Sequence, residues 1–111
     1  MFEKNLNMGY LLDFYGELLS DRKRMAMDMY YNEDFSLAEI AEQMGISRQG
    51  VRDIIKKSEE DLTFFENKLG LAAKLQKAEK LSDELYKEAN DAQIPDRILK
   101  KIAALSDLIR Q

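Results

Sequence analysis

Apolar residues along this chain recur at intervals of three and four positions, the spacing that aligns side chains on one face of an α-helix. The first stripe predicts a helix over roughly residues 5–19. Its inward positions are Met8, Leu11, Leu12, Tyr15, Leu18 and Leu19. A second helix is expected over about 21–32, with Ser20 as its N-cap. In that helix we expect Met25, Met29 and Tyr30 to point inward, and Met27 to face solvent or an interface.

Capping signals divide the rest of the chain into four more helices. Ser36 is followed three residues later by Glu39, which is the capping box that begins a helix, and Gly45 marks the end of that helix. Ser47 caps a long helix that we expect to reach about Lys68. The inward positions of this long helix are Val51, Ile54, Ile55, Ser58, Leu62, Phe65 and Leu69.

Gly70 is a plausible end for the long helix, and two further helices follow over about 71–90 and 95–110. They are separated at Ile94-Pro95, because the residue before a proline disfavours helical backbone. Their apolar stripes are Leu71, Leu75, Ala78, Leu81 and Leu85, and then Ile98, Ile102, Leu105 and Ile109. The pattern therefore predicts an all-α protein. We expect a helix-turn-helix domain over residues 1–70 and a C-terminal helical hairpin or arm over 71–111.

Residues 36–57, SLAEIAEQMGISRQGVRDIIKK, meet the requirements of a helix-turn-helix, in which two short helices pack at a steep angle. Ala41 is small where the two helices would cross closely, and Gly45 suits a left-handed backbone in the turn. The other inward positions, all in register, are Leu37, Ile40, Met44, Ile46, Val51 and Ile54.

Proteins of this class place the start of the second helix in the major groove of double-stranded DNA. Arg48 or Arg52 would then make bidentate contacts to guanine, and Gln49 suits adenine. Ser47 and the helix N-terminus suit a phosphate. The candidate DNA-binding residues are Ser47, Arg48, Gln49, Arg52, Asp53, Lys56 and Lys57. The alternative is a solvated polar face on a helix that only packs.

Charge is unevenly distributed along the chain. The net charge of −4 does not by itself suggest a nucleic-acid partner, but residues 47–57 carry +3 and residues 1–46 carry −5. Local charge steers the approach to DNA, so the basic segment matters more than the total. The acidic residues Glu59, Glu60, Asp61 and Glu66 are interpreted as a solvated face, because neighbouring residues on a helix point in different directions.

The 111 residues include no cysteine and no histidine, which excludes disulfides, thiolate or imidazole metal ligands and His-based catalytic triads. No glycine-rich phosphate loop or nucleophile–base pair is present either. We therefore expect a non-enzymatic protein with no catalytic residue, no metal and no cofactor. Apolar runs span only a few residues, so no membrane insertion is expected, and a cytoplasmic location is the natural interpretation.

Three stretches carry a resemblance to a known family: DFYGELLSDRK at 13–23, MYYNEDFSLAEIAEQMGISRQGV at 29–51, and SEEDLTFFENKLGL at 58–71. The chain resembles region four of bacterial sigma factors, and more closely the YlxM family of small helix-turn-helix proteins. In that family, alanine is usual where Gly50 stands and an aromatic where Arg52 stands. The resemblance implies a DNA-binding protein that regulates or takes part in the signal recognition particle pathway. The alternative that it implies is a protein- or RNA-interaction accessory of the particle that does not bind DNA.

The two C-terminal helices carry more apolar surface than a small core needs, and exposed surface of that kind marks interfaces. The sequence therefore predicts a homodimer through the last three helices. The two recognition helices of such a dimer would lie about 34 Å apart, the spacing of adjacent major grooves. The alternative is that the hairpin packs on the first 70 residues of its own chain.

Overall fold

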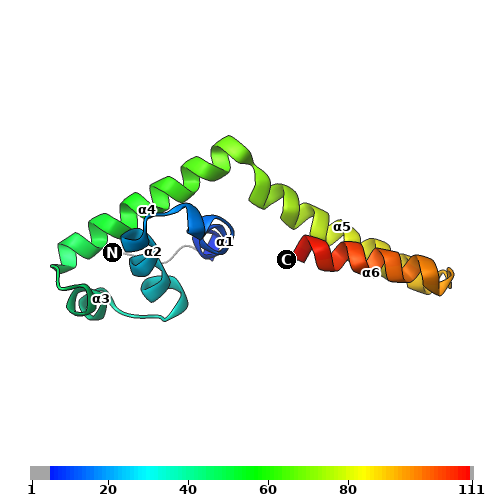
Figure 1. Cartoon of the computed structure of the whole chain (residues 1–111), viewed down its shortest axis with the longest axis horizontal. Helices are drawn as coiled ribbons and strands as arrows, with labels where there is room; N and C mark the ends of the chain where they lie inside the picture. Colours follow the sequence, from blue (N-terminus) through cyan, green and yellow to red (C-terminus); the bar gives the residue numbers. More distant parts are fainter. Residues whose placement is uncertain (1–5, 111) are drawn as a thin grey trace. The chain divides into compact units, whose positions relative to one another are not determined.

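The computed structural model describes residues 6–110 and shows a wholly helical chain (Figure 1). The elements run in the order α1 (Leu6–Tyr15), a 3₁₀ turn η1 (Gly16–Leu18), α2 (Asp21–Met27), a π-helical turn η2 (Asp28–Asn32), α3 (Leu37–Met44), α4 (Arg48–Leu69), α5 (Leu71–Asp91) and α6 (Asp96–Arg110). Over residues 6–110 there are six α-helices and no strand, which confirms the all-α prediction. Residue 5, the expected start of the first helix, lies outside the described residues.

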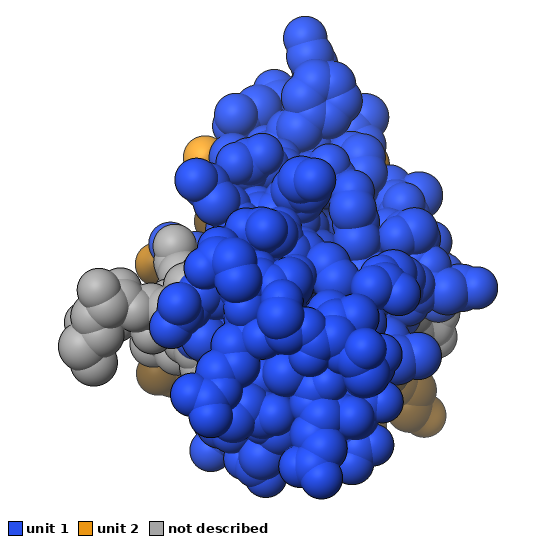
Figure 2. Space-filling model, turned by 90° about the vertical axis from the view of Figure 1, so that its left-hand side faces the viewer, with its two compact units in different colours: residues 1–69 blue, residues 70–111 orange. Residues whose placement is uncertain are grey.

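The chain forms two compact units, residues 1–69 and residues 70–111, which Figure 2 shows in different colours. In the first unit, α1, α2 and α3 all pack against α4 (Figure 1). The buried face of α4 is formed by Val51, Ile55, Ser58 and Leu62. These residues recur at intervals of three and four and form one stripe along α4, which is the central helix of this unit. Ile54 and Phe65 are half-buried. Leu69 is exposed, contrary to the prediction. It lies almost a turn beyond Glu66, the residue of α4 that binds Tyr15 of α1, and so beyond the part of α4 that α1 covers.

The first predicted helix is interrupted near its end. Met8, Leu12 and Tyr15 are buried as expected, but the chain tightens into η1 after Tyr15. Leu18, predicted to face inward, is therefore exposed, because the 3₁₀ turn breaks the spacing that had aligned it with the stripe. Leu19 then returns to the core in extended backbone, just before the Ser20 cap.

The methionines of α2 correct the sequence prediction. Met27 is completely buried, whereas Met25 is 53% exposed. The face that α2 turns toward α4 runs through Lys23, Ala26 and Met27, because the Lys23 ammonium donates to Asp61 of α4 at 2.7 Å. Met29 and Tyr30 of η2 are both buried, as predicted.

The acidic residues of α4 form specific hydrogen bonds, which corrects their interpretation as a solvated face. The hydroxyl of Tyr15 donates to Glu66 at 2.6 Å, and the hydroxyl of Tyr31 donates to Glu59. Asp61 accepts from the α2 lysine described above, and Glu60 is exposed. Three carboxylates in the C-terminal half of α4 thus bind α1, α2 and η2, one element each. We call these three contacts the polar clamps.

The second unit is an antiparallel hairpin of α5 and α6. The turn between them contains Gln93 with a φ of 56°, and the carbonyl of Pro95 accepts the first hydrogen bond of α6. At the other end of α6, the Arg110 guanidinium lies 3.3 Å from Glu79 and also binds Asp83. Gly70, which joins the two units, has the left-handed φ of 62° that ends α4 and favours glycine.

Candidate nucleic-acid interface

The first helix of the predicted motif begins with a complete capping box. The Ser36 hydroxyl accepts from the Glu39 amide at 3.1 Å, and the Glu39 carboxylate accepts from the Ser36 amide at 3.0 Å. The backbone amide of Ser36, which donates to the Glu39 carboxylate, lowers the pKa of Glu39 from its usual 4.5, and the Ser36 hydroxyl lowers it further. Ile40 and Ala41 of α3 are buried, and α3 packs on α4. The predicted start of this helix is confirmed.

The turn that follows is set by Gly45, whose φ of 68° is left-handed. The Ile46 amide donates back to the Ala41 carbonyl at 3.1 Å, which closes the end of α3. Ser47 then caps α4, because its hydroxyl accepts from the Gly50 amide at 3.0 Å. Two residues therefore separate the αL glycine from the first residue of α4, and the predicted helix-turn-helix is present.

Gly50 lies where the start of α4 passes over this turn. A Cβ at that position would meet the Ser47 hydroxyl at 3.3 Å and the Ile46 side chain at 3.5 Å. The close approach that glycine allows here is therefore to the preceding turn of the same chain. An alanine would fit after a shift of a few tenths of an ångström.

The seven predicted contact residues are all exposed. They occupy the cap and the first two and a half turns of α4, on the sides of the helix left open by the buried Val51 and Ile55. Successive members of each row are four residues apart, so their side chains are neighbours along the helix surface. One row holds Arg48, Arg52 and Lys56, and the next holds Gln49, Asp53 and Lys57.

The second row contains a hydrogen bond. The Gln49 amide nitrogen donates to Asp53 at 3.0 Å. This contact orients both side chains while the surface is free. A glutamine must offer its amide nitrogen and oxygen together to read adenine, so Gln49 would release Asp53 on binding that base.

The electrostatics of α4 change sign along its length. Among the described residues, none of the cations Arg48, Arg52, Lys56 and Lys57 has an ion-pair partner within 4.0 Å. The next turn carries Glu59, Glu60 and Asp61. The exposed cations thus cluster in the half of the helix that follows the turn.

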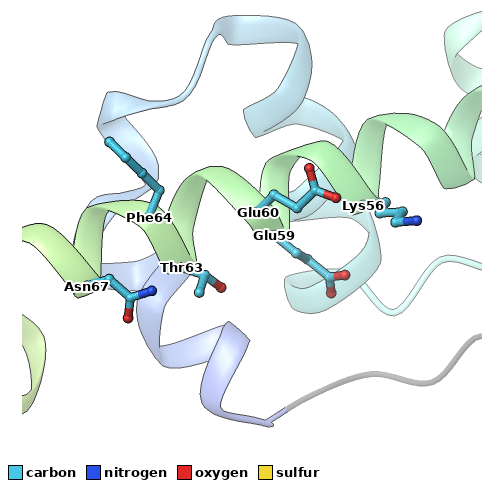
Figure 3. A pocket seen from close by; sticks show the side chains of 6 residues that line it. All are labelled: Lys56, Glu59, Glu60, Thr63, Phe64 and Asn67. Carbon is cyan, nitrogen blue, oxygen red and sulfur yellow. The ribbon is translucent and has the colours of Figure 1, made fainter.

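A shallow groove of about 400 Å³ lies along α4 at this change of sign (Figure 3). All of its lining residues come from α4: Lys56, Glu59, Glu60, Thr63, Phe64 and Asn67. The hydrophobic pattern of the sequence does not predict this groove. Its signal is Phe64, which falls outside the buried stripe of Ser58 and Leu62 and is exposed, with Lys68 5.8 Å above its ring.

Over residues 6–110 no group of three or more His, Cys, Asp or Glu side chains is placed to hold a metal ion. In the same part of the chain, none of the helices combines the length and the apolar character needed to cross a bilayer.

The two helices, their left-handed glycine turn and the exposed polar start of α4 define a helix-turn-helix protein. A family model described as "Putative helix-turn-helix protein, YlxM / p13 like" (UPF0122) matches residues 2–103. The chain is 48% identical over 93 residues to a UPF0122 protein of Halalkalibacterium halodurans, covering 84% of each. It is 43% identical over 100 residues to one of Listeria innocua, covering 90% of this chain and 91% of that one. A third relative, from Exiguobacterium sibiricum, is 42% identical over 106 residues and 96% of each chain. The chain therefore belongs to the UPF0122 family, which confirms the resemblance to YlxM.

Proposed function

We propose that the protein is a cytoplasmic, sequence-specific DNA-binding regulator that reads the major groove with the N-terminal half of α4. The observation that carries the proposal is the set of four exposed cations without ion-pair partners in the described structure, placed directly after a helix-turn-helix turn. Cations in this position meet phosphates and base edges in proteins of this class.

The residues divide into two roles. Arg48 and Arg52 lie nearest the start of α4 and are assigned to guanine, with bidentate hydrogen bonds to its O6 and N7 atoms. Gln49 is assigned to adenine, and Asp53 to the amino group of cytosine.

Three residues are assigned to the phosphate backbone. Lys56 and Lys57 both lie on the third turn of α4, farther from the turn of the motif. Ser47 lies at the helix N-terminus, where backbone amides favour an anion. These contacts would fix the register of the protein on the duplex without reading sequence.

The test is selection from a pool of genomic DNA fragments by the purified full chain at two salt concentrations. We expect enrichment of a defined sequence, with an affinity that falls by about 0.9 log units per phosphate contact for each tenfold rise in salt. On the enriched sequence, changing either Arg48 or Arg52 to Ala should weaken binding by about 1–3 kcal/mol, roughly 5- to 150-fold.

A matched control removes the same charge elsewhere. Lys80→Ala with Lys87→Ala changes two exposed cations of α5 and gives the same net charge as Arg48→Ala with Arg52→Ala. We expect the control to retain sequence-specific binding and the arginine pair to lose it. Because both arginines are exposed, thermal stability should stay within about 0.5 kcal/mol. Equal binding by the two double variants would contradict the assignment of the arginines.

A second candidate is an accessory of the signal recognition particle that contacts protein or RNA and uses the helix-turn-helix only as a scaffold. The net charge of −4 favours it, since double-stranded DNA repels an acidic chain outside residues 47–57. If the pool shows no enriched sequence, a pull-down with the particle's protein and RNA tests this candidate.

A further inference from the structure

The hairpin buries almost none of its large apolar side chains against itself. Over residues 70–110 the buried hydrophobic residues are Ala72 and Ala89, and the buried polar residues are Ser82 and Ser106. The fully buried positions between α5 and α6 are thus alanine and serine, and larger side chains such as Leu99 and Ile102 are only half-buried beside them. Such a seam removes little apolar surface from water. Two helices held by such a seam lack the core that a unit of this size needs to fold alone.

Several exposed leucines of the two helices lie instead toward one face of the hairpin. Leu81 and Leu85 of α5 are 55% and 48% exposed, and Leu105 of α6 is 48% exposed. At 100° per residue, Leu81 and Leu85 fall on one side of the seam, and the apolar stripe of α6 falls on the same side. We call this surface the leucine face. It consists of the exposed Leu81, Leu85 and Leu105 and of three half-buried isoleucines that border the seam, Ile98, Ile102 and Ile109.

The opposite face of the hairpin is polar. A hollow of about 200 Å³ there is lined by Asp83, Tyr86, Ala103, Ser106, Asp107 and Arg110. Asp83 lies about 160° around α5 from Leu81, and Asp107 lies about 160° around α6 from Leu105. The two faces are therefore chemically distinct, and only the leucine face presents a continuous apolar stripe on both helices.

We propose that the leucine face docks on the leucine face of a second copy of this chain, so that two hairpins form a four-helix bundle about a two-fold axis. A second copy supplies an apolar surface of the same length and kind, as an isologous interface requires. The first unit offers less, because its own apolar residues are already buried around α4. Its exposed large hydrophobic residues are spread over η1, α2 and α4: Leu18, Met25, Phe64 and Leu69.

The charges that border the leucine face favour the same occupant. Glu84 and Glu88 run along its edge on α5, and Arg97 and Lys101 run along its edge on α6, at the same end of the hairpin. A two-fold axis parallel to the helices places α5 of one copy beside α6 of the other. The acidic edge of each copy then meets the basic edge of its partner, the pattern that sets orientation in helical bundles.

The first measurement is the mass of the full chain in solution, by size-exclusion chromatography with light scattering over a range of concentrations. We expect twice the chain mass of 12.9 kDa. A mass of 12.9 kDa at every concentration overturns the proposal and favours packing of the hairpin on its own chain. DNA binding plays no part in this readout, so its failure is distinguishable from failure of the proposed function.

Two neighbouring substitutions locate the interface. Leu85→Glu places a charge on the leucine face, and Tyr86→Glu places the same charge on the polar face at a side chain of similar exposure, 40%. We expect the first variant to elute with the mass of one chain and the second to remain a dimer. Dimers in both variants, or loss of the dimer only with Tyr86→Glu, would overturn the assignment of the face.

Charge reversal tests the orientation without touching the apolar residues. Glu84→Lys with Glu88→Lys should weaken the dimer, since four cations then line each shared edge. Adding Arg97→Glu and Lys101→Glu should restore it. Failure of the fourfold variant to regain the dimer mass, while its helical content by circular dichroism is retained, would overturn the proposed two-fold arrangement.

Discussion

Met25 and Met27 lie two residues apart on α2 and face in opposite directions, so they form a matched pair for testing the packing of the first unit. Replacing each with alanine removes the same atoms and makes the same change in helix propensity. The two variants therefore differ only in what surrounds the side chain. Met27 is completely buried between α2 and α4, and Met25 is 53% exposed.

The expected effects differ several-fold. A buried Met→Ala change loses the transfer free energy of the side chain and leaves a cavity, at a cost of about 2–5 kcal/mol. An exposed Met→Ala change away from caps and hydrogen bonds stays within about 0.5 kcal/mol. Since small domains are stable by about 5–15 kcal/mol, Met27→Ala removes a large fraction of the stability of the first unit, and Met25→Ala leaves it nearly unchanged.

The assay is native-state hydrogen exchange at the backbone amides of Ile55 and Leu62, which lie in the buried stretch of α4 and report on opening of the first unit alone. We expect their opening free energies to fall by about 2–5 kcal/mol in Met27→Ala and to be unchanged in Met25→Ala. Comparable losses in the two variants would refute the facing of α2 described above. A larger loss in Met25→Ala would restore the pattern first expected from the sequence.

Two further predictions concern the helix-turn-helix itself. The hydrogen bonds to Ser36 lower the pKa of Glu39, so they add stability that is present above pH 4.5 and is lost as the pH falls through the lowered value. Ser36→Ala keeps the backbone amide, which is the larger cause, and removes the hydroxyl. It should therefore return the pKa of Glu39 only part of the way toward 4.5 and make the stability difference from the parent protein shrink at acid pH, as measured by carboxyl NMR titration and thermal unfolding. A difference that is constant from pH 7 to pH 2 would contradict this linkage. Gly50→Ala should change the unfolding free energy by less than about 1 kcal/mol, because the gain in helix propensity offsets the 3.3 Å contact with the Ser47 hydroxyl. A loss above about 2 kcal/mol in urea unfolding would mean that the turn at Ile46 cannot shift.

Features that depend on local chemistry could be predicted from the sequence. The capping box at Ser36, the left-handed glycines at 45 and 70, and the serine cap of α4 are each specified by a few adjacent residues. The helix-turn-helix follows from them, because its inward positions are fixed once both helix starts are known. The exposure of the candidate contact residues could be predicted in the same way, because the buried face of a helix determines which of its other positions are exposed.

Features that depend on a distant partner could not be predicted. The side of α2 that packs on α4 is set by the contact of Lys23 with Asp61, 38 positions away. The periodicity of the sequence alone does not identify this side, because α2 carries methionines on both of its faces. The polar clamps were missed for the same reason, since Tyr31 and Glu59 are brought together only by the fold. In the hairpin, the helical spacing identified the leucines but gave no sign that alanine and serine would form the seam.

The polar clamps have a consequence for how this protein can diversify. They hold the C-terminal half of α4 in the first unit. In the N-terminal half, Val51 and Ile55 supply the buried contacts. In the part of the chain that the structure describes, the exposed positions of this half form no hydrogen bond or ion pair with another helix. The anchoring contacts and the exposed polar residues thus occupy separate lengths of one helix. Substitutions at positions such as 48, 49, 52 and 53 can alter what the surface binds at little cost in folding. On the proposed function, a lineage carrying this fold is therefore free to explore new DNA sequences by single mutations, without first acquiring compensating changes in its core.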